Sequence, residues 1–215
     1  MTNFKTVTAL TAVIHELGSI SQSPQGWRRQ VEAALRTFPE PLAAVQEHML
    51  SWSHAERADM LARSHETATH YKWLLHCSGP HFKLWLHDYK PAAARGAGYA
   101  EVPHNHRYDL CSRVLQGGFT NLIHQVVDDV AYQASGDDLV SGDLLSLDYR
   151  TVHSLANIVA GSTTLVVEGP RRSKSSTSYP PGAPARSHVD FDGRWDGLLI
   201  RIGESQVHPE VQPHR

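Results

Sequence analysis

Three histidines stand at spacings that suit a single metal ion. His104 and His106 are separated by one residue, and in an extended strand such a pair points to the same side. His153 is the third candidate ligand. Because an isolated His-x-His pair also occurs on protein surfaces by chance, this spacing alone leaves a metal site and a solvated surface equally open.

The residues around His104 and His106 follow a longer pattern. Gly98 lies six positions before His104, and Gly117 lies eleven positions after His106. This arrangement resembles the first motif of the cupin superfamily, G-x5-H-x-H-x3,4-E-x6-G. Leu110 stands where that motif has its glutamate ligand. The resemblance therefore implies a metal site without the carboxylate ligand.

A second stretch resembles the second cupin motif, G-x5-P-x-G-x2-H-x3-N. Gly142, His153 and Asn157 match that motif, whereas Asp148 and Arg150 replace its proline and its second glycine. The two motifs occur in the expected order. The resemblance implies a cupin jelly-roll barrel in which the three histidines bind one metal ion.

The segment from His104 to Gly117 is also similar to the cysteine dioxygenase branch of the cupins. Members of that branch bind ferrous iron through three histidines, carry a cysteine five residues after the second one, and end this segment with Leu-Gln-Gly. Cys111 and residues 115–117 match these features. The likeness extends over about residues 6–170 and is strongest at the ligands. It implies Fe(II) as the cofactor and O2 as a co-substrate.

Two departures indicate that the substrate pocket differs from that of the branch. Trp73, with Lys72 beside it, stands where the family has the arginine that binds the substrate carboxylate. Val166 and Glu168 occupy the positions of a histidine and of the tyrosine that links to the family's cysteine, so Cys111 cannot form that link. We therefore expect a retained metal site, a rebuilt pocket and no oxidation of free cysteine in the family's manner.

The rebuilt pocket has several candidate residues. Glu168 is either a catalytic or ammonium-binding carboxylate or an exposed acid at a strand end. Candidates for substrate binding are Trp73, Trp85, Arg107, Tyr108 and His124, and Cys111 is expected to pack as a small side chain. For Trp85 the alternative is a place in the core, and for Arg107 an outward salt bridge. The other histidines, including His65, His70 and His87, show no ligand spacing and are expected to be inert.

Three neutral imidazoles leave the charge of a divalent ion uncompensated, which favours an anionic or bidentate substrate group at the open positions. Imidazole also suits other metals, so Ni, Mn, Cu and Zn stay compatible beside Fe(II). The leading hypothesis is a non-haem, iron-dependent oxygenase that acts on a small polar, amino-acid-like or thiol metabolite. The alternatives are a non-catalytic metal- or small-molecule-binding cupin and an isomerase or lyase that does not use O2.

Composition restricts the remaining classes. The 215 residues are 40% hydrophobic, which is enough for a packed core. Twenty Lys and Arg against 22 Asp and Glu provide no basic surface for nucleic acid. Two cysteines and the lack of a signal peptide or a long apolar run indicate a cytoplasmic protein without a membrane partner. The oligomeric state is open.

Periodicity indicates a helical part followed by a β part. Apolar residues recur every three to four positions in segments 6–17, 27–38 and 42–52. Ser53 and Glu56 form a capping-box pattern that predicts a shorter fourth helix through Arg63. From about residue 70, short alternating runs separated by turns predict an antiparallel sandwich or barrel. We expect a helical extension over 1–69, a barrel over 70–204 and a frayed tail over 205–215. Residues 171–187 are expected to form a loop or lid, and Leu198–Ile202 a last strand.

Overall fold

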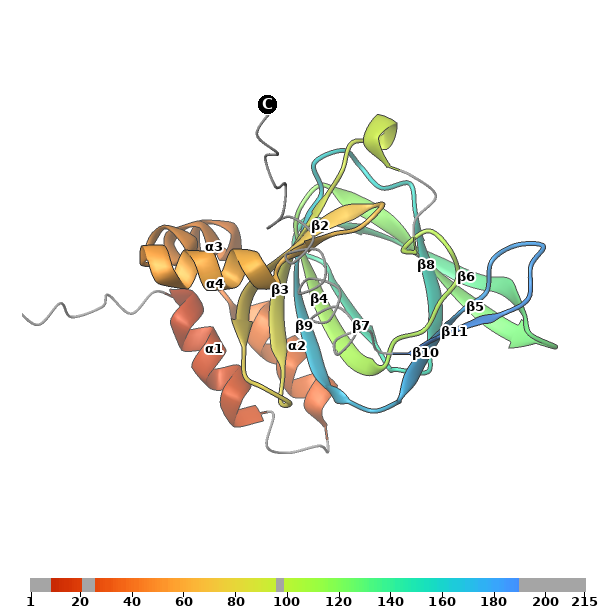
Figure 1. Cartoon of the computed structure of the whole chain (residues 1–215), viewed down its shortest axis with the longest axis horizontal. Coiled ribbons are helices and arrows are strands. Elements are labelled where there is room, and N and C mark those ends of the chain that lie inside the picture. The colour runs from red at the N-terminus through yellow and green to blue at the C-terminus, as the bar shows by residue number, and fades with distance from the viewer. Residues whose placement is uncertain (1–8, 21–25, 96–98, 190–215) are drawn as a thin grey trace, which may run out of the picture.

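The computed structural model describes residues 9–20, 26–95 and 99–189. The predicted strand Leu198–Ile202, the predicted tail 205–215 and the motif residue Gly98 lie outside this part. Helices come first along the chain and strands follow (Figure 1). The helices are α1 (Ala9–Ile20), α2 (Trp27–Thr37), α3 (Pro41–Leu50) and α4 (His54–Arg63), and a short 3-10 helix, η1 (Ala92–Ala94), follows later.

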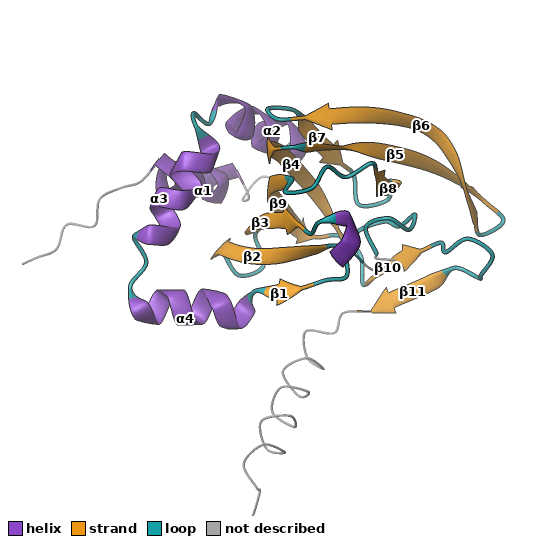
Figure 2. Ribbon diagram, turned by 90° about the horizontal axis from the view of Figure 1, so that it is seen from above, coloured by secondary structure: helices purple, strands orange, loops and turns teal. Residues whose placement is uncertain are grey.

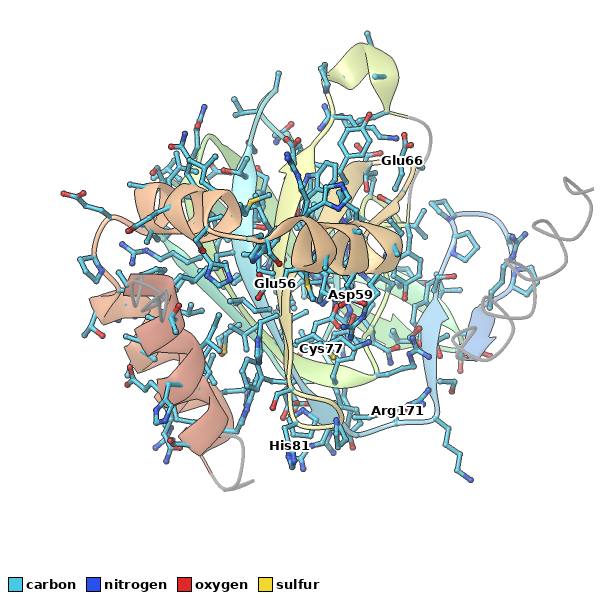
Figure 3. The ribbon with its side chains drawn as sticks, turned by 60° about the vertical axis from the view of Figure 1, so that its left-hand side comes forward. Glu56, Asp59, Glu66, Cys77, His81 and Arg171 are labelled. Carbon is cyan, nitrogen blue, oxygen red and sulfur yellow. The ribbon has the colours of Figure 1, made fainter. Side chains whose placement is uncertain are left out.

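The helices form where their apolar stripes predict them. In α1 the buried residues are Leu10, Val13 and Leu17, at helical spacing on one face. Helix α4 begins with the predicted capping box, in which Ser53 accepts the backbone N–H of Glu56 while the Glu56 carboxylate accepts the backbone N–H of Ser53. Figure 3 shows Glu56 on this helix. Among the described residues, no helix is both long enough and apolar enough to cross a membrane.

The strands form antiparallel sheets. The large sheet has the order β1-β2-β3-β9-β4-β7, a smaller sheet has the order β6-β5-β8, and β10 pairs with β11. The strands are β1 (His65–Glu66), β2 (His70–Cys77), β3 (Lys83–Tyr89), β4 (Tyr108–Gln116), β5 (Gly118–Val127), β6 (Val130–Val140), β7 (Leu144–Leu147), β8 (Val152–Ala156), β9 (Thr163–Arg171), β10 (Ser175–Ser178) and β11 (Arg186–Val189). Figure 2 shows the large and small sheets facing each other. The chain is mostly β, with antiparallel sheets and an N-terminal helical part, so the predicted fold class, mainly β with an N-terminal helical extension, is confirmed.

The two faces of the large sheet have different partners. Leu165 and Val167 of β9 are fully buried in the same hydrophobic cluster as Leu35 of α2. Val166 and Glu168 alternate with them and line a cavity on the opposite face. Because side chains alternate along a strand, β9 joins the helices on one side and supplies the cavity wall on the other.

Three local predictions differ from the structure. Residues 171–187 are not a continuous loop, because they contain β10 and the start of β11. Strands β2 and β8 were not predicted as separate strands. The pair His104 and His106 does not lie in a regular strand: His104 makes isolated bridges with His153 and Ser178, and His106 lies in the segment that leads to β4.

Candidate metal centre

The three candidate ligands meet although they come from distant parts of the chain. The backbone N–H of His104 donates to the carbonyl of His153 (2.9 Å), and the N–H of His153 donates back to the carbonyl of His104 (2.8 Å). This bridge fixes the segment before β4 against β8. His104 and His153 are buried and His106 is half-buried. One ring nitrogen from each histidine lies within 4.8 Å of the other two.

Hydrogen bonds from the outer ring nitrogens orient two of these imidazoles. His104 Nδ1 lies 2.8 Å from the carbonyl of Val102, and His153 Nδ1 lies 2.8 Å from Oδ1 of Asn121. Since both partners are acceptors, each Nδ1 carries the proton and each Nε2 presents a lone pair. This is the usual arrangement of a metal-binding histidine, in which the second nitrogen is held by a neighbouring acceptor.

The spacing and charge of the cluster fit a divalent metal. Nε2 of His106 lies 2.9 Å from Nε2 of His153. Two ligands at right angles, each about 2.1 Å from one ion, lie about 3.0 Å apart. Burial is the main cause that lowers the pKa of both His106 and His153 well below the ordinary value, so both rings are neutral ligands. In the described part of the chain the ligand cluster contains no carboxylate.

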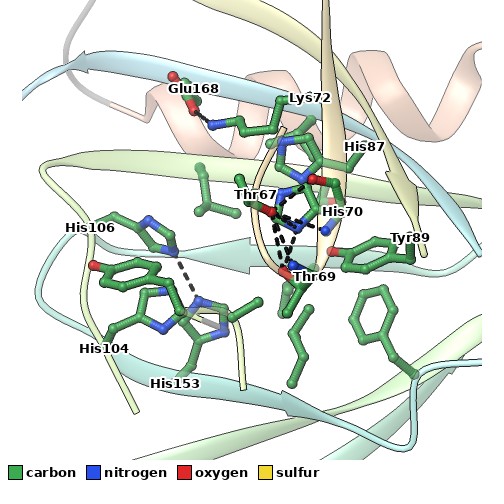
Figure 4. Close-up of a pocket in the computed structure, with 18 of the residues that line it drawn as sticks. Thr67, Thr69, His70, Lys72, His87, Tyr89, His104, His106, His153 and Glu168 are labelled. Atoms are coloured by element: carbon green, nitrogen blue, oxygen red, sulfur yellow. Dashed lines mark hydrogen bonds and ion pairs between the residues drawn. The ribbon is translucent and has the colours of Figure 1, made fainter. Parts of the chain in front are cut away.

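The histidines line a cavity of about 310 Å³ between the two sheets (Figure 4). Its apolar walls come from Leu110, Phe119, Leu145 and Leu155. Leu110 thus faces the cavity at the position where the cupin motif has its glutamate. A cavity of this size, largely apolar and with a few polar groups, is the usual form of a small-molecule site.

Glu168 and Lys72 line the cavity together and form an ion pair. Its Oε1 accepts hydrogen bonds from Lys72 Nζ (3.0 Å) and from the Tyr108 hydroxyl (2.7 Å). Burial alone would raise the pKa of Glu168, but the Lys72 charge and the two hydrogen bonds outweigh it and lower this pKa. Glu168 is therefore a buried, paired carboxylate. Burial, followed by the Glu168 charge, raises the pKa of Tyr108 well above its usual value, so the phenol stays protonated.

The ring of Tyr108 also connects this ion pair with the candidate ligands. It stacks on the His106 imidazole with 5.6 Å between ring centroids and 24° between planes. Lys72 additionally lies over the ring of Trp85, with Nζ 4.7 Å from the centroid. Tyr108 and Glu168 are thus the predicted pocket residues that the structure places in the cavity beside the three histidines.

Four other predicted residues lie outside the cavity lining. Trp73 stacks on Tyr71, and the neighbouring Lys72 enters the cavity in its place. Trp85 is buried against Leu74 and Val166, which agrees with the alternative expectation that it belongs to the core. Arg107 accepts backbone hydrogen bonds from residues 172 and 173 at its carbonyl, and His124 bonds to the Ser154 hydroxyl (2.9 Å).

Cys111 packs on the helical side of the sheet. It is fully buried, and its Sγ lies 3.5 Å from the carbonyl of Arg28 and 3.4 Å from the Ser146 hydroxyl. Burial raises the pKa of its thiol to about 11. The expectation that Cys111 is a packed small side chain agrees with this position.

The sequence interpretation missed a second group of histidines. His65, His70 and His87 line the cavity, and His70 is buried, so the expectation that His70 is a solvated or capping histidine is wrong. The available signal was alternation: His70 and Lys72 share one face of β2, and His87 and Tyr89 share one face of β3. Asn121, which orients His153, was also missed because nothing in the local sequence marks it.

Comparison with known proteins gives likenesses of fold. No protein-family model and no curated protein matches the sequence. Among solved structures, KdgF from Halomonas sp. is 19% identical over 50% of this chain and 90% of its own, with a TM-score of 0.38. The Clostridium difficile EutQ protein is 13% identical over 47% and 68%, with a TM-score of 0.34. An RmlC-like cupin from Shewanella frigidimarina NCIMB 400 is 15% identical over 50% and 85%, with a TM-score of 0.35. At this similarity the likeness concerns the fold alone and leaves reaction and substrate open.

Proposed function

We propose that this chain is a metal-dependent enzyme, a non-haem Fe(II) oxygenase that acts on a small polar, amino-acid-like or thiol metabolite. The observation that carries this proposal is the convergence of three imidazoles on one cavity of about 310 Å³. A ferrous ion held by His104, His106 and His153 would bind O2 and the donor atoms of the substrate.

The charge of the ligand set favours particular substrates. Three neutral histidines do not reduce the charge of a divalent ion, and the ligand cluster of the described residues adds no carboxylate. A thiolate, carboxylate or amine on the substrate compensates that charge better than a neutral group does. A small metabolite with such a head group therefore fits the metal side of the cavity.

The ion pair beside the metal centre suits the charges of an amino-acid-like molecule. Lys72 donates one hydrogen bond to Glu168 and has further N–H groups for a substrate carboxylate. Glu168 receives both of its hydrogen bonds on Oε1, which leaves Oε2 for a substrate ammonium. Tyr108 holds the carboxylate in place and keeps its own proton. These three residues would bind and orient the substrate next to the metal ligands.

Oxygen consumption tests the proposal directly. The purified chain is loaded anaerobically with Fe(II), mixed with a panel of small thiols, amino acids and amines, and then exposed to O2 in an electrode cell. We expect uptake with at least one compound, and none with His153→Ala. No uptake with any compound, together with no metal on the purified protein, contradicts the proposal. Turnover that persists with Zn(II) and without O2 selects the isomerase or lyase alternative instead.

A further inference from the structure

We propose that His70 and His87 form a neutral hydrogen-bonding subsite in the cavity, which binds an uncharged acceptor such as an amide or ketone oxygen on the substrate tail. This inference rests on the proposed function for the metal-binding head of the same substrate. It assigns to the substrate a second feature, an uncharged oxygen acceptor, that the metal centre does not specify.

The hydrogen bonds around His70 favour one tautomer of its ring. The Thr67 hydroxyl donates its proton to the carbonyl of His70 (2.7 Å), and its oxygen accepts the backbone N–H groups of His70 (3.0 Å) and Thr69 (3.3 Å). Thr67 therefore has no proton left for His70 Nδ1. The Thr69 hydroxyl lies 2.8 Å from Nδ1 of His70. When this hydroxyl donates its proton to Nδ1, both the hydroxyl and the ring nitrogen have a partner. The proton of the His70 ring is then on Nε2.

That N–H group is buried and has no acceptor. His70 is 8% exposed, and its Nε2 has no hydrogen-bond partner within the described part of the chain. Nε2 of His87, a half-buried residue, is also a buried ring nitrogen without a hydrogen-bond partner in the described chain, and the two ring centroids are 4.5 Å apart. Both residues line the cavity that contains the metal ligands, as Figure 4 shows. A buried donor without a partner is costly, so a ligand that supplies an acceptor gains affinity there.

The charges of the cavity favour an uncharged acceptor over a carboxylate at this subsite. Burial is the main cause that lowers the pKa of His70 to about 3 and that of His87 well below the ordinary value, so both rings are neutral near pH 7. Among the cavity-lining residues of the described chain, the charged pair Lys72 and Glu168 is already joined at 3.0 Å. At these two uncharged rings a second anionic group would exchange its hydration for hydrogen bonds from neutral donors, whereas an amide loses much less hydration.

Ligands that differ in one group test this subsite without any oxygen chemistry. Zn(II) binds imidazole and does not activate O2, so Zn(II)-loaded protein isolates binding. The probes are succinamate, succinate and 4-methylpentanoate, which share a carboxylate head and a two-methylene spacer but end in an amide, a carboxylate and an isopropyl group. Glutaramate, glutarate and 5-methylhexanoate repeat the comparison with one more methylene. Calorimetry gives the dissociation constants.

We expect the amide of at least one series to bind about 10-fold more tightly than its apolar isostere, the size of effect expected for one buried hydrogen bond. His70→Phe, which keeps a ring against Tyr89, removes that preference because the amide then has no N–H donor at this position. Thr69→Val reduces the preference because Nδ1 loses its donor. The matched control His76→Phe, on the same strand but outside the cavity, keeps it.

Three results overturn the subsite: tighter binding of the dicarboxylate than of the amide in both series, an amide preference that survives His70→Phe, or no binding of any amide. Folding of each variant is checked by its thermal transition, and Thr69→Val provides the same test if His70→Phe does not fold. The comparison is repeated with metal-free protein. Failure of Zn(II) to bind contradicts the proposed function, whereas a lost amide preference in both forms contradicts the subsite.

Discussion

We expect Asn121 to control how well His153 binds a metal ion, and Asn121→Leu tests this role. Asn121 is 2% exposed, and its Oδ1 accepts the Nδ1–H of His153 at 2.8 Å. Leucine has a similar size but no acceptor. Without the acceptor, either a buried N–H group stays unpaired or the proton moves to Nε2, the nitrogen that must be free to bind the ion. Both outcomes weaken metal binding.

The structure sets the size of this effect. An unsatisfied buried donor costs about 1–3 kcal/mol. Loss of such an outer partner weakens metal binding by about 10- to 100-fold, which is about 1.4–2.7 kcal/mol. The two estimates agree, so we expect the dissociation constant of Zn(II) or Fe(II) to rise by about 10- to 100-fold in Asn121→Leu.

Competition against a chromophoric chelator measures this change. Asn121→Asp keeps an acceptor and is expected to bind metal at least as tightly as the wild type. Thr120→Val is the control on the same strand, because it removes hydrogen bonds to Asp138 and Asn157 that do not involve the ligands. If folded Asn121→Leu binds metal with unchanged affinity, the hydrogen bond does not orient His153 and this reasoning is refuted.

Three further predictions concern the ion pair, the buried thiol and the α4 cap. Glu168→Gln leaves the Lys72 ammonium without its partner, so it lowers the free energy of unfolding at neutral pH by about 3 kcal/mol, measured by denaturant titration. The pKa of Glu168 is lowered in the folded state, so the ionised carboxylate stabilises the fold above the unfolded pKa of 4.5, and this contribution is lost as pH falls through the folded pKa. The Glu168→Gln variant should therefore lose less stability on acidification than the wild type. Cys77, which is half-buried, should react with a thiol reagent in the native protein, whereas Cys111 should react only on unfolding. Equal reaction rates of the two thiols in the native protein would contradict the burial of Cys111. Ser53→Ala breaks the capping box and should cost about 1 kcal/mol, seen as a lower thermal midpoint, with Ser53→Asp restoring it.

Local patterns predicted the helices and the clustering of the three histidines. The apolar stripe of α1 and the capping box at Ser53 depend on residues within a few positions of one another, so their signal is present in the sequence. The register around His104, His106 and His153 lies in two short motifs. The structure brings these residues together as that register predicted.

Contacts between distant strands could not be predicted in the same way. Lys72 and Glu168 are 96 residues apart and meet because β3 lies between β2 and β9. The alternation of His70 with Lys72 predicts that they share a face, but it does not tell whether that face lines a cavity or meets solvent. For the same reason Trp73 was expected in the pocket, although the register of β2 directs Lys72 there.

Metal stoichiometry tests the central claim most directly. The chain is dialysed against Fe(II) without oxygen, freed of loosely bound ions, and analysed for metal by mass spectrometry together with His104→Ala, His106→Ala and His153→Ala. The three-histidine centre predicts one ion per chain in the wild type and a large loss in each folded variant. A wild-type chain without metal, or folded variants that keep one ion per chain, would contradict it.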